Sequence, residues 1–307
     1  MTLIISVTTP EGIVMASDSR QSQRNNKNMT RISTNSANKI FSINNRVIVA
    51  TAGLAFFADN SGIQRNVSEY IREFTKLTDY EELTVKEIAY QLHDFLNNKY
   101  PWEEQLEMSA QQFKMEAQRS GSQIISMDKK SDGIEFKIRQ PNGLIEDGKL
   151  NIEVINILIS GYNTDGSSET YEIRSPGIID IKRRSGEYGS TWIGQGDLVS
   201  RLILGYDGRL LNLPSFGEIF QKNQEQTIQQ LRGLEYNIQW GLLTLQDAID
   251  LAVFLIKSTE TLQKYGDGIN MDIGEIQGVG GPIDVVVITK DNGIEWLKHK
   301  TLTVPEY

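Results

Sequence analysis

The stretch TLIISVTTPEGIVMASDSR, residues 2–20, contains two β-branched and aliphatic runs separated by Pro10-Glu11-Gly12. Proline presets one turn dihedral and glycine tolerates positive φ, so the pattern predicts a tight β-hairpin. In that hairpin Thr2 heads the first strand, and Asp18 ends the second strand, which runs back beside it. The hairpin therefore suggests a hydroxyl and a carboxylate at the same end of two neighbouring strands.

The same pattern, a glycine in a turn followed by an apolar run, recurs along the chain. Residues 40–53, IFSINNRVIVATAG, predict a further pair of strands with Asn44-Asn45 at the bend. The other segments of this kind are 130–138, 175–183 and 290–297. Strands are therefore expected near both ends of the chain and in its middle.

Between the strand blocks the apolar period changes from two to about 3.6, which predicts two pairs of amphipathic helices. The first pair has apolar stripes at Ile63, Val67, Ile71 and Phe74, and at Ile88, Leu92, Phe95 and Leu96. The second pair consists of one helix from about Leu198 and a longer helix over 244–262. The apolar stripe of the longer helix is Ala248, Leu251, Ala252 and Leu255. Thr84 with Glu87, and Thr244 with Asp247, have the spacing of N-terminal caps.

Alternating strand blocks and helix pairs predict an α+β fold. Two antiparallel sheets packed face to face, each covered by a helix pair, would bury all of these apolar faces, so we expect a four-layer αββα sandwich in one domain, 1–307. Residues 102–150 and 206–240 fit this scheme poorly and are predicted to be insertions.

Composition excludes several classes of function. A formal charge of −9 without a dense basic run argues against a nucleic-acid partner. The absence of cysteine and the presence of only two histidines argue against thiolate or His-rich metal sites, and no metal or cofactor is expected. Neither a signal sequence nor a run of about 20 apolar residues is found, which predicts a soluble, cytoplasmic protein without a membrane partner.

Hydrolysis by a side chain needs a nucleophile and a base that removes its proton. His93 lies in the middle of a predicted helix and His299 lies between two lysines, so neither favours a His-based triad. A terminal amine, with a pKa of about 7.7–8.0, is the other base available near neutral pH. Removal of Met1 would give Thr2 both a hydroxyl and that amine.

Such an amine is kept partly neutral by a nearby buried cation, which itself needs a carboxylate partner. Lys39, at the start of the KIFSI strand, and Asp18 are the natural pair. The backbone amide of Gly53, at the end of VATAG, would then be the oxyanion donor. Each feature taken alone has an ordinary structural explanation, so the hypothesis depends on their combination.

TLIISVTTPEGIVMASDSR, NKIFSINNRVIVATAGLA, Ala58-Asp59 and GGPIDVVVITKDNGIEW together resemble the β subunits of the proteasome and the bacterial HslV peptidase, which are N-terminal nucleophile (Ntn) hydrolases. The resemblance implies the αββα fold. Thr2 matches the nucleophile, Asp18 and Lys39 the ion pair, and Gly53 the oxyanion glycine. A polar loop, residues 20–38, makes the Asp18-to-Lys39 spacing longer than usual.

The resemblance also implies a substrate pocket and shows two departures. Ala37, Phe41, Thr51 and Ala55 would line the pocket beside Thr2. Gln195, in Gly194-Gln195-Gly196-Asp197, is a secondary-site residue that replaces a helper serine. Ile276 and Val279 replace the Asp and Ser that steady the amine, and Asp272 and Glu275 are possible substitutes.

The function predicted from these residues is that of a threonine peptidase that forms an acyl-enzyme with a peptide or polypeptide substrate. Two alternatives remain open: an inactive subunit retained for assembly, and an Ntn amidase that acts on small-molecule amides. The relatives form rings or open spirals, so the resemblance implies a homo-oligomer, and an ATP-dependent unfoldase is a possible partner.

Overall fold

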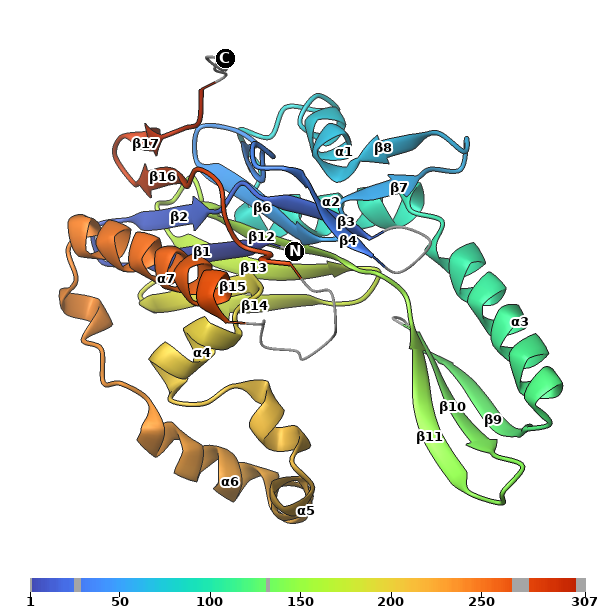
Figure 1. Cartoon of the computed structure of the whole chain (residues 1–307). Coiled ribbons are helices and arrows are strands. Elements are labelled where there is room, and N and C mark those ends of the chain that lie inside the picture. Colours follow the sequence, from blue (N-terminus) through green and yellow to red (C-terminus); the bar gives the residue numbers. More distant parts are fainter. Residues whose placement is uncertain (1, 25–28, 131–132, 267–275, 302–307) are drawn as a thin grey trace, which may run out of the picture.

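The predicted first hairpin is confirmed as strands β1 (Leu3–Thr8) and β2 (Ile13–Ser17), which pair antiparallel with Ile4 opposite Ser17. A computed structural model describes residues 2–24, 29–130, 133–266 and 276–301 (Figure 1). Within these residues β1 and β2 lie at the centre of a five-stranded antiparallel sheet. Its order is β15 (Gly189–Gly194), β1, β2, β16 (Asp284–Thr289), β17 (Gly293–Lys298).

The strands predicted within residues 40–53 belong to a second five-stranded antiparallel sheet. Its order is β14 (Ile179–Arg183), β13 (Ser168–Ser175), β12 (Ile155–Tyr162), β6 (Val47–Gly53), β5 (Ile40–Ser42). Gly53 thus ends β6 and lies opposite Ile155, the first residue of β12.

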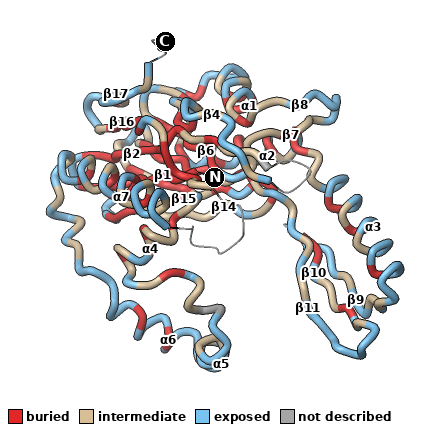
Figure 2. The backbone as a smooth tube through the Cα atoms, viewed as in Figure 1, coloured by how far each residue is buried: buried red, intermediate tan, exposed pale blue. Residues whose placement is uncertain are grey.

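The two sheets share a core of apolar side chains, because one buried cluster contains residues of both. Its members include Ile4, Met15, Ile48, Leu158 and Val286. Alternate residues of the same strands point away from this cluster into two outer clusters that the helices cover. Figure 2 shows this burial concentrated in the sheets and in the sides of the helices that face them.

The four predicted helices are present, two against each sheet. Helices α1 (Val67–Phe74) and α2 (Val85–Lys99) pack on the sheet that contains β6, while α4 (Asp197–Leu204) and α7 (Leu245–Tyr265) pack on the sheet that contains β1. Both predicted capping boxes form, at Thr84 and at Thr244. Mixed helices and antiparallel sheets make the chain an α+β protein.

The prediction for the first helix was wrong at its start. Ile63 is 60 % exposed and lies in the turn of a short hairpin, between β7 (Phe56–Ala58) and β8 (Gln64–Asn66), and the Asn66 side chain caps α1. The polar loop expected at 20–38 also contains paired strands, β3 (Gln21–Arg24) and β4 (Thr30–Thr34). The side chains of both strands are mostly polar, and those of β4 are exposed or half-buried, so the pair lacks the apolar alternation from which strands are recognised.

Residues 102–150 form a projection with a small core of its own. Helix α3 (Trp102–Ser120) packs on a three-stranded sheet of β9 (Gln123–Lys130), β10 (Gly133–Arg139) and β11 (Ile145–Asn151). The Tyr100 hydroxyl donates a hydrogen bond to the Glu153 carbonyl at 2.9 Å, so the chain leaves and re-enters the body at one point.

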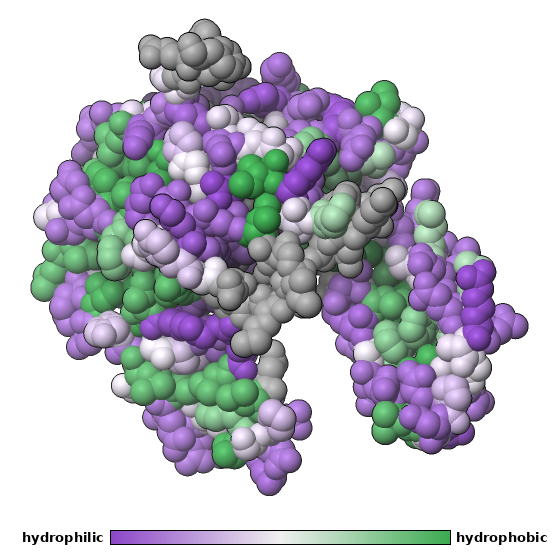
Figure 3. All heavy atoms as spheres, viewed as in Figure 1, coloured by the Kyte–Doolittle hydropathy of each residue, from purple (hydrophilic) through white to green (hydrophobic). Residues whose placement is uncertain are grey.

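The second segment, 206–240, is helical. It contains α5 (Pro214–Lys222), α6 (Gln224–Leu231) and short 3-10 helices at Gly208–Asn212 and Arg232–Leu234. The space-filling view shows the two projections standing apart on the same side of the body (Figure 3).

Candidate active site

Thr2 lies at the head of β1, 7 % exposed, where the ends of several strands from both sheets meet. Its carbonyl accepts a hydrogen bond from the Gln195 backbone amide at 2.7 Å. Gly194, directly before, has φ +89°, and a Cβ atom there would overlap the Thr2 carbonyl. Only glycine therefore allows the end of β15 to approach Thr2 so closely.

Asp18 follows the last residue of β2 and is completely buried. Its Oδ1 accepts hydrogen bonds from the Leu3 amide at 2.9 Å and from the Lys39 ammonium at 2.7 Å. Its Oδ2 accepts from the amides of Arg20 and Gly280, each at 3.1 Å. One carboxylate thus connects β1, the lysine and the segment that leads into β16, and four donors satisfy it.

Lys39 is the residue before β5 and is 4 % exposed. Its ammonium also donates to the Arg20 carbonyl at 2.6 Å. Burial lowers the pKa of Lys39 below its usual value, and Asp18 opposes this shift. Lys300 and Arg20, two further cations nearby, lower the same pKa. The site therefore holds a concentration of positive charge.

Gly53 has φ +82°, and a Cβ atom there would overlap the Val154 carbonyl and lie 3.0 Å from Nδ2 of the Asn156 side chain. Thr2, Lys39 and Gly53 line one small cavity of about 30 Å³. The side chains of Asp18 and Lys39 meet just behind it.

Of the four predicted pocket residues, Thr51 and Ala55 line this cavity. Ala37 and Phe41 are not among the described residues that line it: Ala37 donates its amide to the Ser19 carbonyl, and Phe41 packs against the core under α1 and α2. The alternation of β5 turns Phe41 to the outer face of its sheet, which the sequence match did not reveal. The other lining residues are Gln21, Asn38, Ala52, Leu54, Asn66 and Val67.

The Gln195 side chain accepts a hydrogen bond from Gln263 Nε2 at 2.9 Å. Gln263, on α7, uses its own oxygen to accept from the amides of Gly278 and Val279. Gln263 is a residue that sequence reasoning missed, because glutamines near the end of an amphipathic helix are ordinarily solvated. It links the secondary-site residue to the segment beside Asp18.

At the positions expected to steady the amine, Val279 is completely buried in the core under α4 and α7, and Ile276 is partly buried. Asp272 and Glu275 lie outside the described residues, as does Met1. Arg20 and Gly280 were also missed by sequence reasoning, although the pair Gly280-Gly281 is a signal of close backbone approach.

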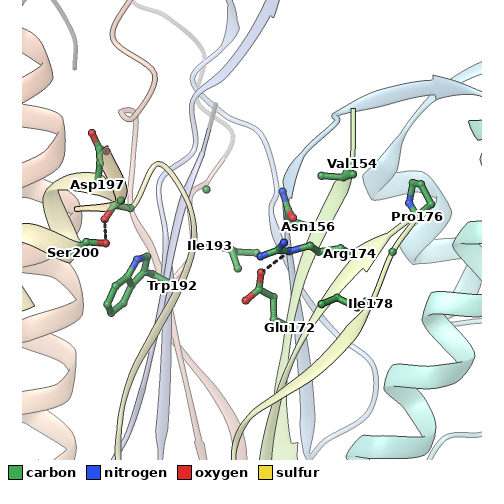
Figure 4. A pocket seen from close by; sticks show the side chains of 14 residues that line it. Val154, Asn156, Glu172, Arg174, Pro176, Ile178, Trp192, Ile193, Asp197 and Ser200 are labelled. Atoms are coloured by element: carbon green, nitrogen blue, oxygen red, sulfur yellow. Dashed lines mark hydrogen bonds and ion pairs between the residues drawn. The ribbon is translucent and has the colours of Figure 1, made fainter. Parts of the chain in front are cut away.

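A larger crevice of about 690 Å³ adjoins the site. Figure 4 shows its two walls: Trp192, Asp197 and Ser200 on one side, and Glu172, Arg174 and Ile178 on the other. Asn156, beside Gly53, and Gly194, beside Thr2, belong to its lining. The crevice is therefore lined by residues that contact Thr2 and Gly53, two of the residues that line the small cavity.

These groups are suited to acyl transfer: a buried hydroxyl, an ion pair beside it and a backbone amide at the same cavity. Within the described ranges, no cluster of three or more His, Asp or Glu side chains is placed to hold a metal ion. No helix in the described part of the chain has the length and apolarity needed to cross a bilayer.

Residues 2–130 match the family model described as Proteasome subunit. The matched segment includes Thr2, Asp18, Lys39 and Gly53, so the part of the chain that holds these residues is similar to proteasome subunits. A search of curated proteins finds no match.

Proposed function

We propose that this chain is a proteasome-like threonine peptidase whose nucleophile is the Thr2 hydroxyl. One observation carries the proposal: Thr2, Lys39 and Gly53 line a single cavity, with the Asp18 carboxylate 2.7 Å from the Lys39 ammonium. The similarity of residues 2–130 to proteasome subunits supports the same reading.

The proposed reaction starts after removal of Met1. The free Thr2 amine takes the hydroxyl proton while Oγ attacks the peptide carbonyl, and the Gly53 amide donates to the oxyanion. Collapse breaks the C–N bond, and the leaving amine takes the proton from the Thr2 ammonium. Water, deprotonated by the same amine, then attacks the ester, releases the acyl product and regenerates Thr2.

Lys39 has the role of keeping that amine neutral. A cation close to an amine lowers the amine's pKa, because two positive charges repel. Asp18 allows the lysine to remain charged in a buried place and holds its ammonium at one position.

The substrate is proposed to be a polypeptide that passes across Thr2. The small cavity lined by Thr51 and Ala55 suits a short apolar side chain, while the 690 Å³ crevice has room for several residues of extended chain. Arg174, half-exposed in the crevice wall, provides a donor for polar groups of that chain.

The proposal includes the architecture of the relatives. Two face-to-face sheets with helices outside form a four-layer αββα sandwich in a single domain, into which 102–150 and 206–240 are inserted. We place the protein in the cytoplasm as a homo-oligomeric ring or spiral, with an ATP-dependent unfoldase as a possible partner. Exposed apolar side chains on the second projection, such as Leu213, Ile219 and Leu234, are of the kind that assembly covers.

An inactive assembly subunit is the alternative favoured by one observation. The Gln195 side chain is bound to Gln263, and Val279 is buried in the core, so neither can replace the serines of the active relatives. An amidase for small molecules is the other alternative, which the small size of the cavity permits.

The test compares wild type with Thr2→Ala and Thr2→Ser on casein and on fluorogenic peptides, with Thr261→Ala, an exposed position of α7, as the matched control. We expect cleavage by the wild type and the control, loss in Thr2→Ala, and covalent labelling of Thr2 by a β-lactone probe. Intact mass establishes whether Met1 is removed. Retained Met1 with no cleavage favours the assembly subunit, and hydrolysis of small amides alone favours the amidase.

A further inference from the structure

A second buried ion pair lies on the strand next to the one that carries Asp18. Asp284, the first residue of β16, is 1 % exposed, and its carboxylate forms an ion pair with the Lys300 ammonium, whose side chain is 7 % exposed. The Lys300 backbone amide donates to the other carboxylate oxygen at 2.8 Å. The segment after β17 is thus fixed to the start of β16 by two contacts.

The sheet register places this pair close to the proposed catalytic groups. Ser17 lies between Ile4 of β1 and Asp284 of β16 in one row across the sheet. Met15 and Val286 point into the core between the sheets, so alternation directs Ser17 and Asp284 to that same inner face. Ile4 shares that face, and so does Thr2 at the head of its strand.

Ser17, between the two ion pairs, contributes no charge. Its hydroxyl is buried and has no hydrogen-bond partner in the described part of the chain. In such a buried region charges act on one another with little screening by water.

Lys300 acts on Lys39 more clearly than its partner does. Burial is the main cause of the lowered pKa of Lys39; the charges of Lys300 and Arg20 lower this pKa as well, whereas Asp18 raises it. The Lys300 ammonium therefore adds positive potential at Lys39, and the Asp284 carboxylate paired with it offsets part of that potential. Among the described residues, the charges that act on Lys39 are those of Asp18, Lys300 and Arg20, and Asp284 is the ion-pair partner of Lys300.

We propose that Lys300, held by Asp284, is an electrostatic positioning residue that adds positive potential at Thr2 and Lys39. This inference rests on the proposed function, since the group it serves is the free amine of Thr2. Lys300 touches no reacting atom, and its influence passes through the potential at the amine and through Lys39.

The experiment measures kcat/KM against pH for Lys300→Met, Asp284→Asn and the double variant. Lys298→Met is the matched control, because Lys298 has the same charge two residues away and is exposed. Loss of Lys300 removes a repelling charge, so the acid limb should move up by about half a pH unit. Asp284→Asn leaves Lys300 without its counter-charge, so the limb should move down by about the same amount.

The double variant should lie near wild type, and Lys298→Met should not shift the limb. Opposite shifts in the two single variants would support the inference, because mere loss of structure lowers both rates without opposite shifts. The inference would be overturned if the acid limb moved in the same direction in both single variants. It would also be overturned if the acid limb did not move in variants whose thermal unfolding stays cooperative.

A second readout separates this inference from the proposed function. Competitive acetylation of the Thr2 amine at a series of pH values, read by peptide mass spectrometry, reports the pKa of that amine without any need for peptide cleavage. If the wild type cleaves no peptide, the proposed function fails. Opposite shifts of the Thr2 amine pKa in Lys300→Met and Asp284→Asn, relative to that wild type, would still support the inference. If the wild type cleaves peptides but the amine pKa does not shift in the variants, the inference is overturned and the proposed function stands. If Met1 is still attached, both the inference and the proposed function are overturned.

Discussion

The Lys39 ammonium lies 2.7 Å from the Asp18 carboxylate, and both side chains are shielded from solvent at the end of the sheets where Thr2 is found. Replacement of one member of such a pair leaves the other charge buried without compensation, which costs about 3–5 kcal/mol. The pair therefore connects stability, protonation and the proposed chemistry.

Asp18→Asn should lower the pKa of Lys39 further, because Asp18 is the group that raises it. In the proposed mechanism Lys39 must be charged, so the alkaline limb of the pH–rate profile should move to lower pH. The folded-state pKa lies below that of the unfolded lysine, so the unfolded state binds more protons between these two values, and the free energy of unfolding should rise with pH across that window.

Urea denaturation between pH 7 and 10 and kcat/KM over the same range check this prediction. Asp147→Asn is the control, since its pair with Lys137 is a surface ion pair whose members are 74 % and 45 % exposed. An alkaline limb identical in wild type and Asp18→Asn would show that Asp18 does not govern the charge of Lys39.

Gly53→Ala should abolish peptide cleavage. The new methyl group would overlap the Val154 carbonyl and force the amide proposed as oxyanion donor to move, a loss of about 100-fold or more in kcat. Gly62→Ala is the matched control, because Gly62 has a similar φ of +78° with no atom within 4 Å of the added carbon. Both variants should lose about 1 kcal/mol of stability from backbone strain, Gly53→Ala should lose more because of the overlap, and only Gly53→Ala should lose activity.

Gly208→Phe should obstruct the large crevice. Gly208 lines it and has open space where a side chain would be added. We expect a higher KM for casein with little change for a short fluorogenic peptide, because only the longer chain needs the crevice. Gly233→Phe, at a position equally open but absent from the crevice lining, is the control. Equal effects on both substrates would argue against a role of the crevice in substrate binding.

Thr244→Ala should lower the free energy of unfolding by about 1 kcal/mol, because it removes the N-cap of α7. Asp247 donates its amide to the Thr244 hydroxyl, and its carboxylate accepts from the Thr244 hydroxyl and backbone amide; the substitution removes the two hydroxyl contacts and leaves the amide contact. Thr261→Ala, the same substitution at an exposed site inside α7, should be neutral or slightly stabilising. Chemical denaturation of the two variants checks the difference, and equal stabilities would contradict it.

Replacement of residues 104–149 by a short Gly-Ser linker should leave a body that folds cooperatively. The ends are already adjacent, since Tyr100 contacts Glu153, and the projection has its own apolar cluster around Leu106 and Ile134. Circular dichroism melting and cleavage of a short peptide are the measurements. Loss of cooperative unfolding would mean that 102–150 belongs to the main core and is not an insertion.

The sequence by itself determined the local elements, because their signals are local. The Pro10-Glu11-Gly12 turn, the capping boxes at Thr84 and Thr244 and the apolar stripes of α2 and α7 each depend on neighbours a few residues away. It failed at Ile63 and at the polar pair β3–β4, where strand pairing rather than apolar periodicity decides the structure.

Only the tertiary structure decided which distant groups meet. It brought Gly280 to Asp18, Gln263 to Gln195 and Lys300 to Asp284, contacts between residues separated by 16 to 262 positions. It also turned Phe41 away from the cavity. Such contacts depend on sheet register and on the face each strand presents, which are set by packing of the whole core.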